Sequence, residues 1–305
     1  MARRPTIGLA LGGGGARGAA HIGALQVLES NQIPIDKIAG TSAGAIIGAM
    51  YAGSMDALWV EDRFRQFLKS DLFKDLGTDR INEQPPTAGT VFGQIAKKLK
   101  NQVVLAMSLH RDSIIKRSRL QEAFDYLIPV KTFEALKLPL QVVATDLNTC
   151  SHVVYDSGDV VEAVTRSGTI PGFVEPTEAN GSLIVDGGAS MPLPTGVIRD
   201  SVDVLLAVDI RRRGVKPLGE KNIYEIMMRS DMSTYQNLIN HCARLADVLI
   251  SPEVKDHPWS SFDHFDFFFE NGTQSAQDAL ESIHAEISKK KSLNYRLKQW
   301  FGHQN

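Results

Sequence analysis

Apolar runs alternate with helical stretches through the first part of the chain, and this alternation predicts the fold class. Continuous apolar runs predict strands at residues 7–11, 37–39, 140–144 and 202–210. The last of these runs is apolar almost throughout, as expected for a strand that helices cover on both faces. Helical patterns fall at residues 19–29, 43–52 and 159–166. Strands that alternate with helices indicate an α/β protein built on a layered sheet.

A turn motif and a later change in pattern complete the organisation. The pair Asn180-Gly181 predicts a tight hairpin turn, and residues 183–185 form the strand that leaves it. Farther along, the pattern changes to helices and one aromatic segment. We therefore expect one domain over residues 6–215 and a mainly helical C-terminal extension, residues 216–305, packed on it.

Composition and charge exclude several classes of protein. The chain has 305 residues, 43% hydrophobic and 22% charged, with a formal net charge of -2, so nothing indicates a nucleic-acid partner. Cys150 and Cys242 cannot form a disulfide framework and have no metal-type spacing, which favours the reducing cytoplasm. No run approaches the ~18 apolar residues of a membrane-spanning helix. Any membrane contact is therefore expected to be peripheral, at the surface of the inner membrane.

Four consecutive glycines at residues 12–15 lie between a predicted strand and a predicted helix. Such a loop lets the main chain approach a ligand closely, and N–H groups at a helix N-terminus favour negative charge. Two ligands suit it, a phosphate or the oxyanion of an acyl-transfer intermediate. Residues 13–18 also match the dinucleotide fingerprint, which requires an acidic residue after the second strand. Asp36 precedes that strand, however, and Gly40 stands where the acid belongs.

A second glycine-flanked motif contains a candidate nucleophile. Residues 40–44 read Gly-Thr-Ser-Ala-Gly between a predicted strand and a predicted helix. This is the nucleophile-elbow pattern, in which Ser42 would occupy a sharp turn with its hydroxyl exposed. The flanking residues must be small because the strand and the helix approach closely there. The motif therefore predicts a nucleophilic serine beside the first glycine loop.

An activated serine needs a base, and Asp186 is the better candidate. It ends the predicted strand 183–185 and is followed by Gly187 and Gly188, which allow other main chain to come close. Seven histidines follow Ser42, and none of them lies at a clean junction of strand and loop: His110, His152, His241, His257, His264, His284 and His303. We therefore expect these histidines to be solvated or packed rather than catalytic.

Taken together, these motifs resemble the patatin-like phospholipase family. Residues 13–18 (Gly-Gly-Gly-Ala-Arg-Gly), 40–44 and 186–188 (Asp-Gly-Gly) have the order and spacing of bacterial members. The resemblance covers roughly residues 6–210. It implies a patatin-like three-layer α/β/α sandwich with a mainly parallel central sheet and a helical C-terminal extension.

The resemblance also implies a Ser–Asp dyad in place of a triad. Ser42 would be the nucleophile, Asp186 the general base, and the N–H groups of Gly13, Gly14 and Gly15 the oxyanion hole. The remaining motif positions would support this site: Arg17, Gly18, Gly40, Gly44, Gly187 and Gly188. Family members hydrolyse acyl esters of phospholipids, lysophospholipids or neutral lipids without calcium, so no metal or organic cofactor is expected. Two alternatives remain, a nucleotide-binding protein that uses the glycine loop and a non-catalytic regulatory protein on the same scaffold.

Two amphipathic stretches and three departures from the family pattern bear on the lipid substrate. Residues 91–107 and 276–301 each combine an apolar stripe with lysines, which suits either contact with a membrane surface or docking on the domain. We favour docking for both. Arg166, Gly168 and Thr169 depart from the usual family residues, and we expect all three at the wall of the acyl pocket.

Overall fold

A mixed eight-stranded sheet lies at the centre of the computed structural model, which describes residues 4–77, 115–179, 181–214, 217–219 and 222–291. Its strand order is β5-β6-β3-β2-β1-β7-β8, and β4 pairs with β3 beside this path. The strands are β1 (Ile7–Leu11), β2 (Lys37–Thr41), β3 (Leu140–Asp146), β4 (Ser151–Tyr155), β5 (Thr177–Ala179), β6 (Ser182–Asp186), β7 (Val204–Val208) and β8 (Val248–Ile250). All predicted strands are present at or near the expected residues.

Parallel pairing joins the five strands β3, β2, β1, β7 and β8, whereas β4, β5 and β6 are attached by antiparallel pairs. The expectation of a mainly parallel sheet is confirmed. Register across β3 brings two chain segments together: Thr41 of β2 is opposite Val143, and Asp186 of β6 is opposite Ala144. The residue after Thr41 and the last residue of β6 therefore lie on the two sides of β3.

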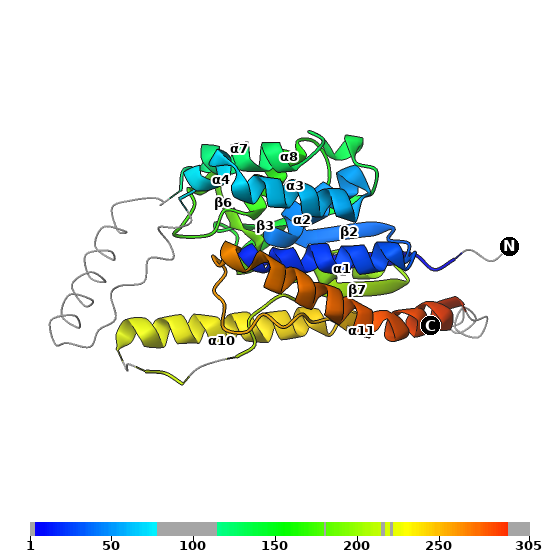
Figure 1. Cartoon of the computed structure of the whole chain (residues 1–305). Coiled ribbons are helices and arrows are strands. Elements are labelled where there is room, and N and C mark those ends of the chain that lie inside the picture. The colour runs from blue at the N-terminus through cyan, green and yellow to red at the C-terminus, as the bar shows by residue number, and fades with distance from the viewer. Residues whose placement is uncertain (1–3, 78–114, 180, 215–216, 220–221, 292–305) are drawn as a thin grey trace.

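Helices cover both faces of the sheet, as expected for an α/β/α sandwich (Figure 1). They are α1 (Ala19–Ser30), α2 (Ala43–Ser54), α3 (Ala57–Lys69), α4 (Asp71–Asp75), α7 (Arg117–Leu127), α8 (Val160–Ser167), α9 (Thr195–Ile198), α10 (Ile223–Ala243) and α11 (Phe265–Lys291). Single turns of 3₁₀ helix span Gly15–Gly18, Phe133–Ala135, Gly187–Ala189, Arg199–Ser201 and Phe262–His264.

Successive side chains of the buried strands pack alternately into two separate hydrophobic cores. Leu9 and Leu11 of β1 belong to the larger core, together with residues of α1, α2, α7, α8 and α11. Ala10 faces the opposite way, into a smaller core with α9 and α10. Because successive strand side chains point to opposite faces, a strand covered on both faces is apolar throughout, which explains the uninterrupted apolar runs.

The C-terminal residues complete the sheet as well as one helical layer. Strand β8 pairs in parallel with β7, and this strand was not predicted, because it has only three residues. Helix α11 packs along α1 through glycines: a Cβ on Gly272 would lie 2.1 Å from the Ala20 carbonyl oxygen, and one on Gly23 would lie 2.2 Å from the Phe269 carbonyl oxygen. The domain boundary at residue 215 stays a prediction.

The prediction that the two amphipathic stretches dock on the domain can be checked for only part of one stretch. Residues 91–107 lie outside the described residues, and so do residues 292–301 of the second stretch. In the remainder of the second stretch, Ala276 and Ile283 of α11 are buried in the larger core, in agreement with docking on the domain. None of the helices that the structure describes has the length and apolar character needed to cross a bilayer.

Candidate active site

Ser42 occupies a sharp turn between β2 and α2. Its φ of 53° and ψ of -119° lie in a region that non-glycine residues rarely adopt, and such strain is concentrated at functional sites. Two glycines permit the turn: a Cβ on Gly40 would lie 2.5 Å from the Ala45 Cα, and one on Gly44 would lie 2.1 Å from the Leu11 carbonyl oxygen. The predicted elbow is thus present, and the close approach of strand and helix explains the small residues around it.

Asp186 reaches Ser42 across strand β3. The Ser42 hydroxyl donates a hydrogen bond of 2.5 Å to Asp186 Oδ2, and the Gly188 N–H donates one of 2.6 Å to Oδ1. Both side chains are largely buried, with 7% of Ser42 and 6% of Asp186 exposed. Gly187 fits beneath them because a Cβ there would lie 2.2 Å from the Val143 carbonyl oxygen. The structure therefore brings together the two side chains that the sequence placed 144 positions apart.

Burial changes the acidity of this carboxyl group. It raises the pKa of Asp186 from an ordinary value of 3.8 to about 6, because desolvation penalises the ionised form. The hydrogen bonds from Ser42 and Gly188 act in the opposite direction but do not cancel the effect of burial. Asp186 is therefore ionised at neutral pH and is a stronger base than an exposed aspartate.

Ser167 fixes the main chain of the elbow, a role that the sequence did not reveal. Its fully buried hydroxyl accepts a hydrogen bond of 2.8 Å from the Ser42 N–H and donates one of 2.5 Å to the Val143 carbonyl oxygen. The hydroxyl thereby connects the Ser42 amide to β3, the strand that lies between Ser42 and Asp186. A serine at the C-terminal end of an amphipathic helix carries no local signal of this role.

The glycine loop faces Ser42, but its three candidate donors are not equivalent. A Cβ on Gly13 would lie 3.4 Å from Ser42 Cβ, so the loop packs directly against the elbow. The Gly13 N–H, however, donates a hydrogen bond of 2.9 Å to the Pro192 carbonyl oxygen. Within the described part of the chain, the N–H groups of Gly14 and Gly15 donate to no main-chain oxygen, unlike those of Gly12 and Gly13. The expectation for Gly13 is corrected on this ground, since its N–H is already engaged.

Two side chains hold the loop in place. Arg17 Nε donates a hydrogen bond of 3.0 Å to the Gly14 carbonyl oxygen, as expected for a supporting residue, and burial lowers the pKa of its guanidinium. His21 lies completely buried with Nε2 2.8 Å from the Gly12 carbonyl oxygen. Burial lowers the pKa of His21 to about 4, so the ring is neutral and Nε2 carries the donated proton. Our sequence analysis missed His21; its position on the helix that follows the loop is the only local signal.

Among the described residues, the histidines that follow Ser42 take no part in this hydrogen-bond network. Those that the structure describes make no hydrogen bond to Ser42 or Asp186, whereas His110 and His303 lie outside the described residues. His257 and His264 instead pack against each other, with ring centroids 3.9 Å apart. In the described ranges, no three His, Cys, Asp or Glu side chains gather where they could hold a metal ion.

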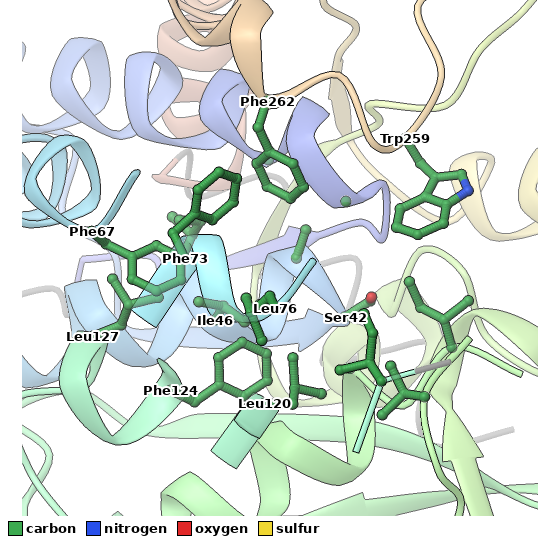
Figure 2. A pocket seen from close by; sticks show the side chains of 18 of the residues that line it. Ser42, Ile46, Phe67, Phe73, Leu76, Leu120, Phe124, Leu127, Trp259 and Phe262 are labelled. Carbon is green, nitrogen blue, oxygen red and sulfur yellow. The ribbon is translucent and has the colours of Figure 1, made fainter. Parts of the chain in front are cut away.

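An apolar pocket extends from the Ser42 hydroxyl (Figure 2). It has a volume of about 100 Å³, with Ser42 at one end and Phe67 and Leu127 at the other. Apart from the Ser42 hydroxyl and the Trp259 indole N–H, the described residues that line it carry apolar side chains or none. The pocket therefore has the shape and chemistry to hold a hydrocarbon chain whose polar end lies at the serine.

The three departures from the family pattern differ in position. Thr169 does not line the pocket, contrary to our expectation, because its buried hydroxyl donates a hydrogen bond of 2.8 Å to the Thr165 carbonyl oxygen. Gly168 lines the pocket, where a Cβ would come within 3.1 Å of the Phe124 ring. Arg166 does not line it, contrary to our expectation. Its guanidinium forms an ion pair with Glu162 and lies over the ring of Tyr155, because the charge finds a carboxylate and an aromatic face beside α8.

A buried carboxylate bonded to a serine on a strand-to-helix turn, beside a glycine loop, places this chain in the class of α/β proteins with a nucleophile elbow. The family comparison is more specific. The family model described as patatin-like phospholipase matches residues 9–198, so the chain belongs to that family. This confirms the resemblance that the three motifs indicated.

Individual relatives share the same region. An uncharacterised NTE family protein of Mycobacterium bovis is 30% identical over 210 residues, which are 68% of this chain and 49% of the relative. The human patatin-like phospholipase domain-containing protein 6 is 30% identical over 208 residues, 67% of this chain and 13% of the relative. The chain thus spans about half or less of these relatives. Among solved structures, VipD from Legionella pneumophila has a TM-score of 0.48 at 16% identity, over 92% of this chain and 67% of that one.

Proposed function

We propose that this protein is a serine lipid acyl hydrolase that uses Ser42 and Asp186 as a catalytic dyad. The observation that carries the proposal is the 2.5 Å hydrogen bond between the two side chains at the end of an apolar pocket. Membership of a phospholipase family supports an ester of a fatty acid as the substrate. The acyl chain would lie in the pocket, and its carbonyl carbon would lie within reach of the Ser42 hydroxyl.

The reaction follows from the positions of these groups. Asp186 accepts the proton of the Ser42 hydroxyl as the serine oxygen attacks the acyl carbonyl carbon. The free N–H groups of Gly14 and Gly15 stabilise the resulting oxyanion, and one such donor contributes about 3 kcal/mol in comparable sites. The protonated Asp186 returns the proton to the leaving alcohol, and water then releases the acyl group with Asp186 again as base. This sequence needs no metal ion or organic cofactor.

The nucleotide-binding alternative is disfavoured by the position of Asp36. Its carboxylate accepts a hydrogen bond from the N–H of Ile7, at the start of β1, and pairs with Arg4. The glycine loop follows Leu11, at the other end of the same strand. Asp36 therefore lies at the opposite end of the strands from the glycine loop, and it cannot hold the ribose of a nucleotide bound at that loop. Tight dinucleotide binding without ester hydrolysis would overturn the proposal.

Two assays test the proposal: covalent labelling of the serine and ester hydrolysis. A fluorophosphonate should add its mass once to the parent protein, at Ser42, and not to Ser42→Ala. Ser54→Ala is the matched control, because Ser54 ends the same helix and its hydroxyl bonds only to main-chain atoms of Met50 and Asp56. The parent and the control should hydrolyse p-nitrophenyl butyrate and lysophosphatidylcholine, with and without EDTA. Hydrolysis by Ser42→Ala at the parent rate would overturn the dyad, and the regulatory alternative predicts no turnover by any variant.

A further inference from the structure

Trp259 lies against the glycine loop although it comes from outside the region that matches the family. Its carbonyl oxygen accepts a hydrogen bond of 2.7 Å from the Ala16 N–H. A Cβ on Gly15 would lie 2.4 Å from that oxygen and 3.1 Å from Cε3 of the Trp259 ring. Gly15 also has a positive φ of 59°. Both the main chain and the ring of Trp259 are therefore in direct contact with one of the two free oxyanion donors.

The Trp259 ring bounds the pocket at the end where Ser42 lies. Figure 2 shows the indole on the Ser42 side, far from Phe67 and Leu127. The ring meets Phe173 edge-on, with centroids 5.0 Å apart and an angle of 78° between the planes, and both aromatic residues line the pocket. A fatty acyl group attached to Ser42 has carbons 2 and 3 immediately beside its carbonyl. These carbons must therefore pass the space that Trp259 limits, whereas the end of the chain meets Phe67.

Packing of the segment that follows Trp259 restricts the movement of this residue. Phe262, three residues later, also lines the pocket and meets the Phe73 ring edge-on at 5.1 Å. The chain then enters α11, whose Gly272 approaches the main chain of α1 without room for a side chain. Trp259 is thus held by the glycine loop and by the Phe173 ring, and the segment that follows it is anchored by Phe262 and α11. A bulky group near the acyl carbonyl cannot displace it without breaking these contacts.

We infer that Trp259 is a specificity-determining residue that selects acyl groups unbranched at carbon 2. The inference rests on the proposed function, since it concerns the acyl group that Ser42 accepts. A methyl branch at carbon 2 would occupy the space of the indole ring, next to a carbonyl that the oxyanion donors fix. Esters of straight-chain fatty acids are therefore preferred, and the selecting residue comes from the C-terminal part of the chain.

The test measures a ratio of two rates for each variant. The substrates are p-nitrophenyl butyrate and p-nitrophenyl isobutyrate, which differ in branching at carbon 2. For Trp259→Ala, the ratio of kcat/KM for isobutyrate to that for butyrate should rise about tenfold over the parent, since one misfitting methyl group changes specificity by this order. Phe67→Ala is the matched control at the far end. It should leave this ratio within twofold of the parent and shift the preferred chain length upward.

The ratio does not depend on how much of each variant is folded, and Trp259→Leu provides a second, less drastic variant. A ratio within twofold of the parent for both Trp259 variants overturns the inference, even if their total activity falls. An equal rise of this ratio for Phe67→Ala also overturns the inference, because selection against the branch would then not depend on the residue next to Ser42. A parent protein inactive on both esters overturns the proposed function itself, which is a separate outcome.

Discussion

Replacing Asp186 by Asn should abolish turnover and at the same time stabilise the protein above pH 6. Asparagine is nearly the same size and can still accept one of the two hydrogen bonds, from Ser42 or Gly188, but it cannot take a proton from the serine. The carboxylate that it replaces is buried, and burial raises its pKa from 3.8 to about 6. The ionised group that the proposed mechanism requires is therefore unfavourable for the folded state.

The size of this effect follows from the pKa. Each pKa unit corresponds to about 1.4 kcal/mol, so the change from 3.8 to about 6 corresponds to about 3 kcal/mol, to order of magnitude. Between about pH 4 and 6 the folded state binds a proton that the unfolded state has lost, so the parent loses stability as the pH rises through this window. Above pH 6 the whole destabilisation is present. The asparagine variant has no such dependence.

Urea denaturation at pH 4.0 and pH 7.5 measures the prediction. The free energy of unfolding of Asp186→Asn, relative to the parent, should be higher at pH 7.5 than at pH 4.0 by about 2 kcal/mol, because part of the effect is already present at pH 4.0. Ester hydrolysis measured on the same preparations should be lost at both values. An equal difference in stability at the two pH values would refute a pKa raised by burial. Retained hydrolysis would refute the role of Asp186 as the base.

Four further predictions concern the same site. In the parent, kcat/KM should fall about tenfold per pH unit below about 6, because Asp186 must be ionised to act as base; a flat profile from pH 5 to 8 contradicts this. Ser167→Ala should lower kcat and destabilise the fold by about 1–3 kcal/mol, since the Ser42 N–H and the Val143 carbonyl oxygen lose their buried partner; an unchanged melting temperature and kcat would refute it. Gly44→Ala should cost about 1–3 kcal/mol in chemical denaturation, because its Cβ would press on the Leu11 carbonyl oxygen, whereas at an unobstructed helix position the same change is stabilising. EDTA should leave the rate of ester hydrolysis unchanged, and a loss that calcium restores would contradict the proposed mechanism.

The sequence predicted the pair of side chains at the site because each has a local signal. Ser42 lies in a glycine-flanked elbow, and Asp186 ends an apolar strand before two glycines. Their proximity did not follow from these signals, because β6 runs antiparallel to β3 and the register of that pair sets Asp186 opposite Ala144; only the family resemblance implied it. The fold class followed from the same apolar runs.

Contacts between distant segments left no such signal. The engagement of the Gly13 N–H depends on the Pro192 carbonyl oxygen, which any residue could supply. Strand β8 is too short to show periodicity, and it forms because it pairs in parallel with β7. Trp259 lies in an irregular segment, and only the three-dimensional structure shows that it borders the pocket. Tertiary packing decides these features, and single-sequence patterns do not report it.

Strand β3 separates the two residues of the dyad, and this arrangement bears on how the protein fails when heated. Ser42 follows β2, in the parallel half of the sheet, while Asp186 ends β6, which joins β3 by only three antiparallel residue pairs. Local opening of so short a ladder requires less free energy than unfolding the buried parallel strands. Heating should therefore separate the carboxylate from the hydroxyl first, and esterase activity should vanish at a temperature where most of the helical circular dichroism persists.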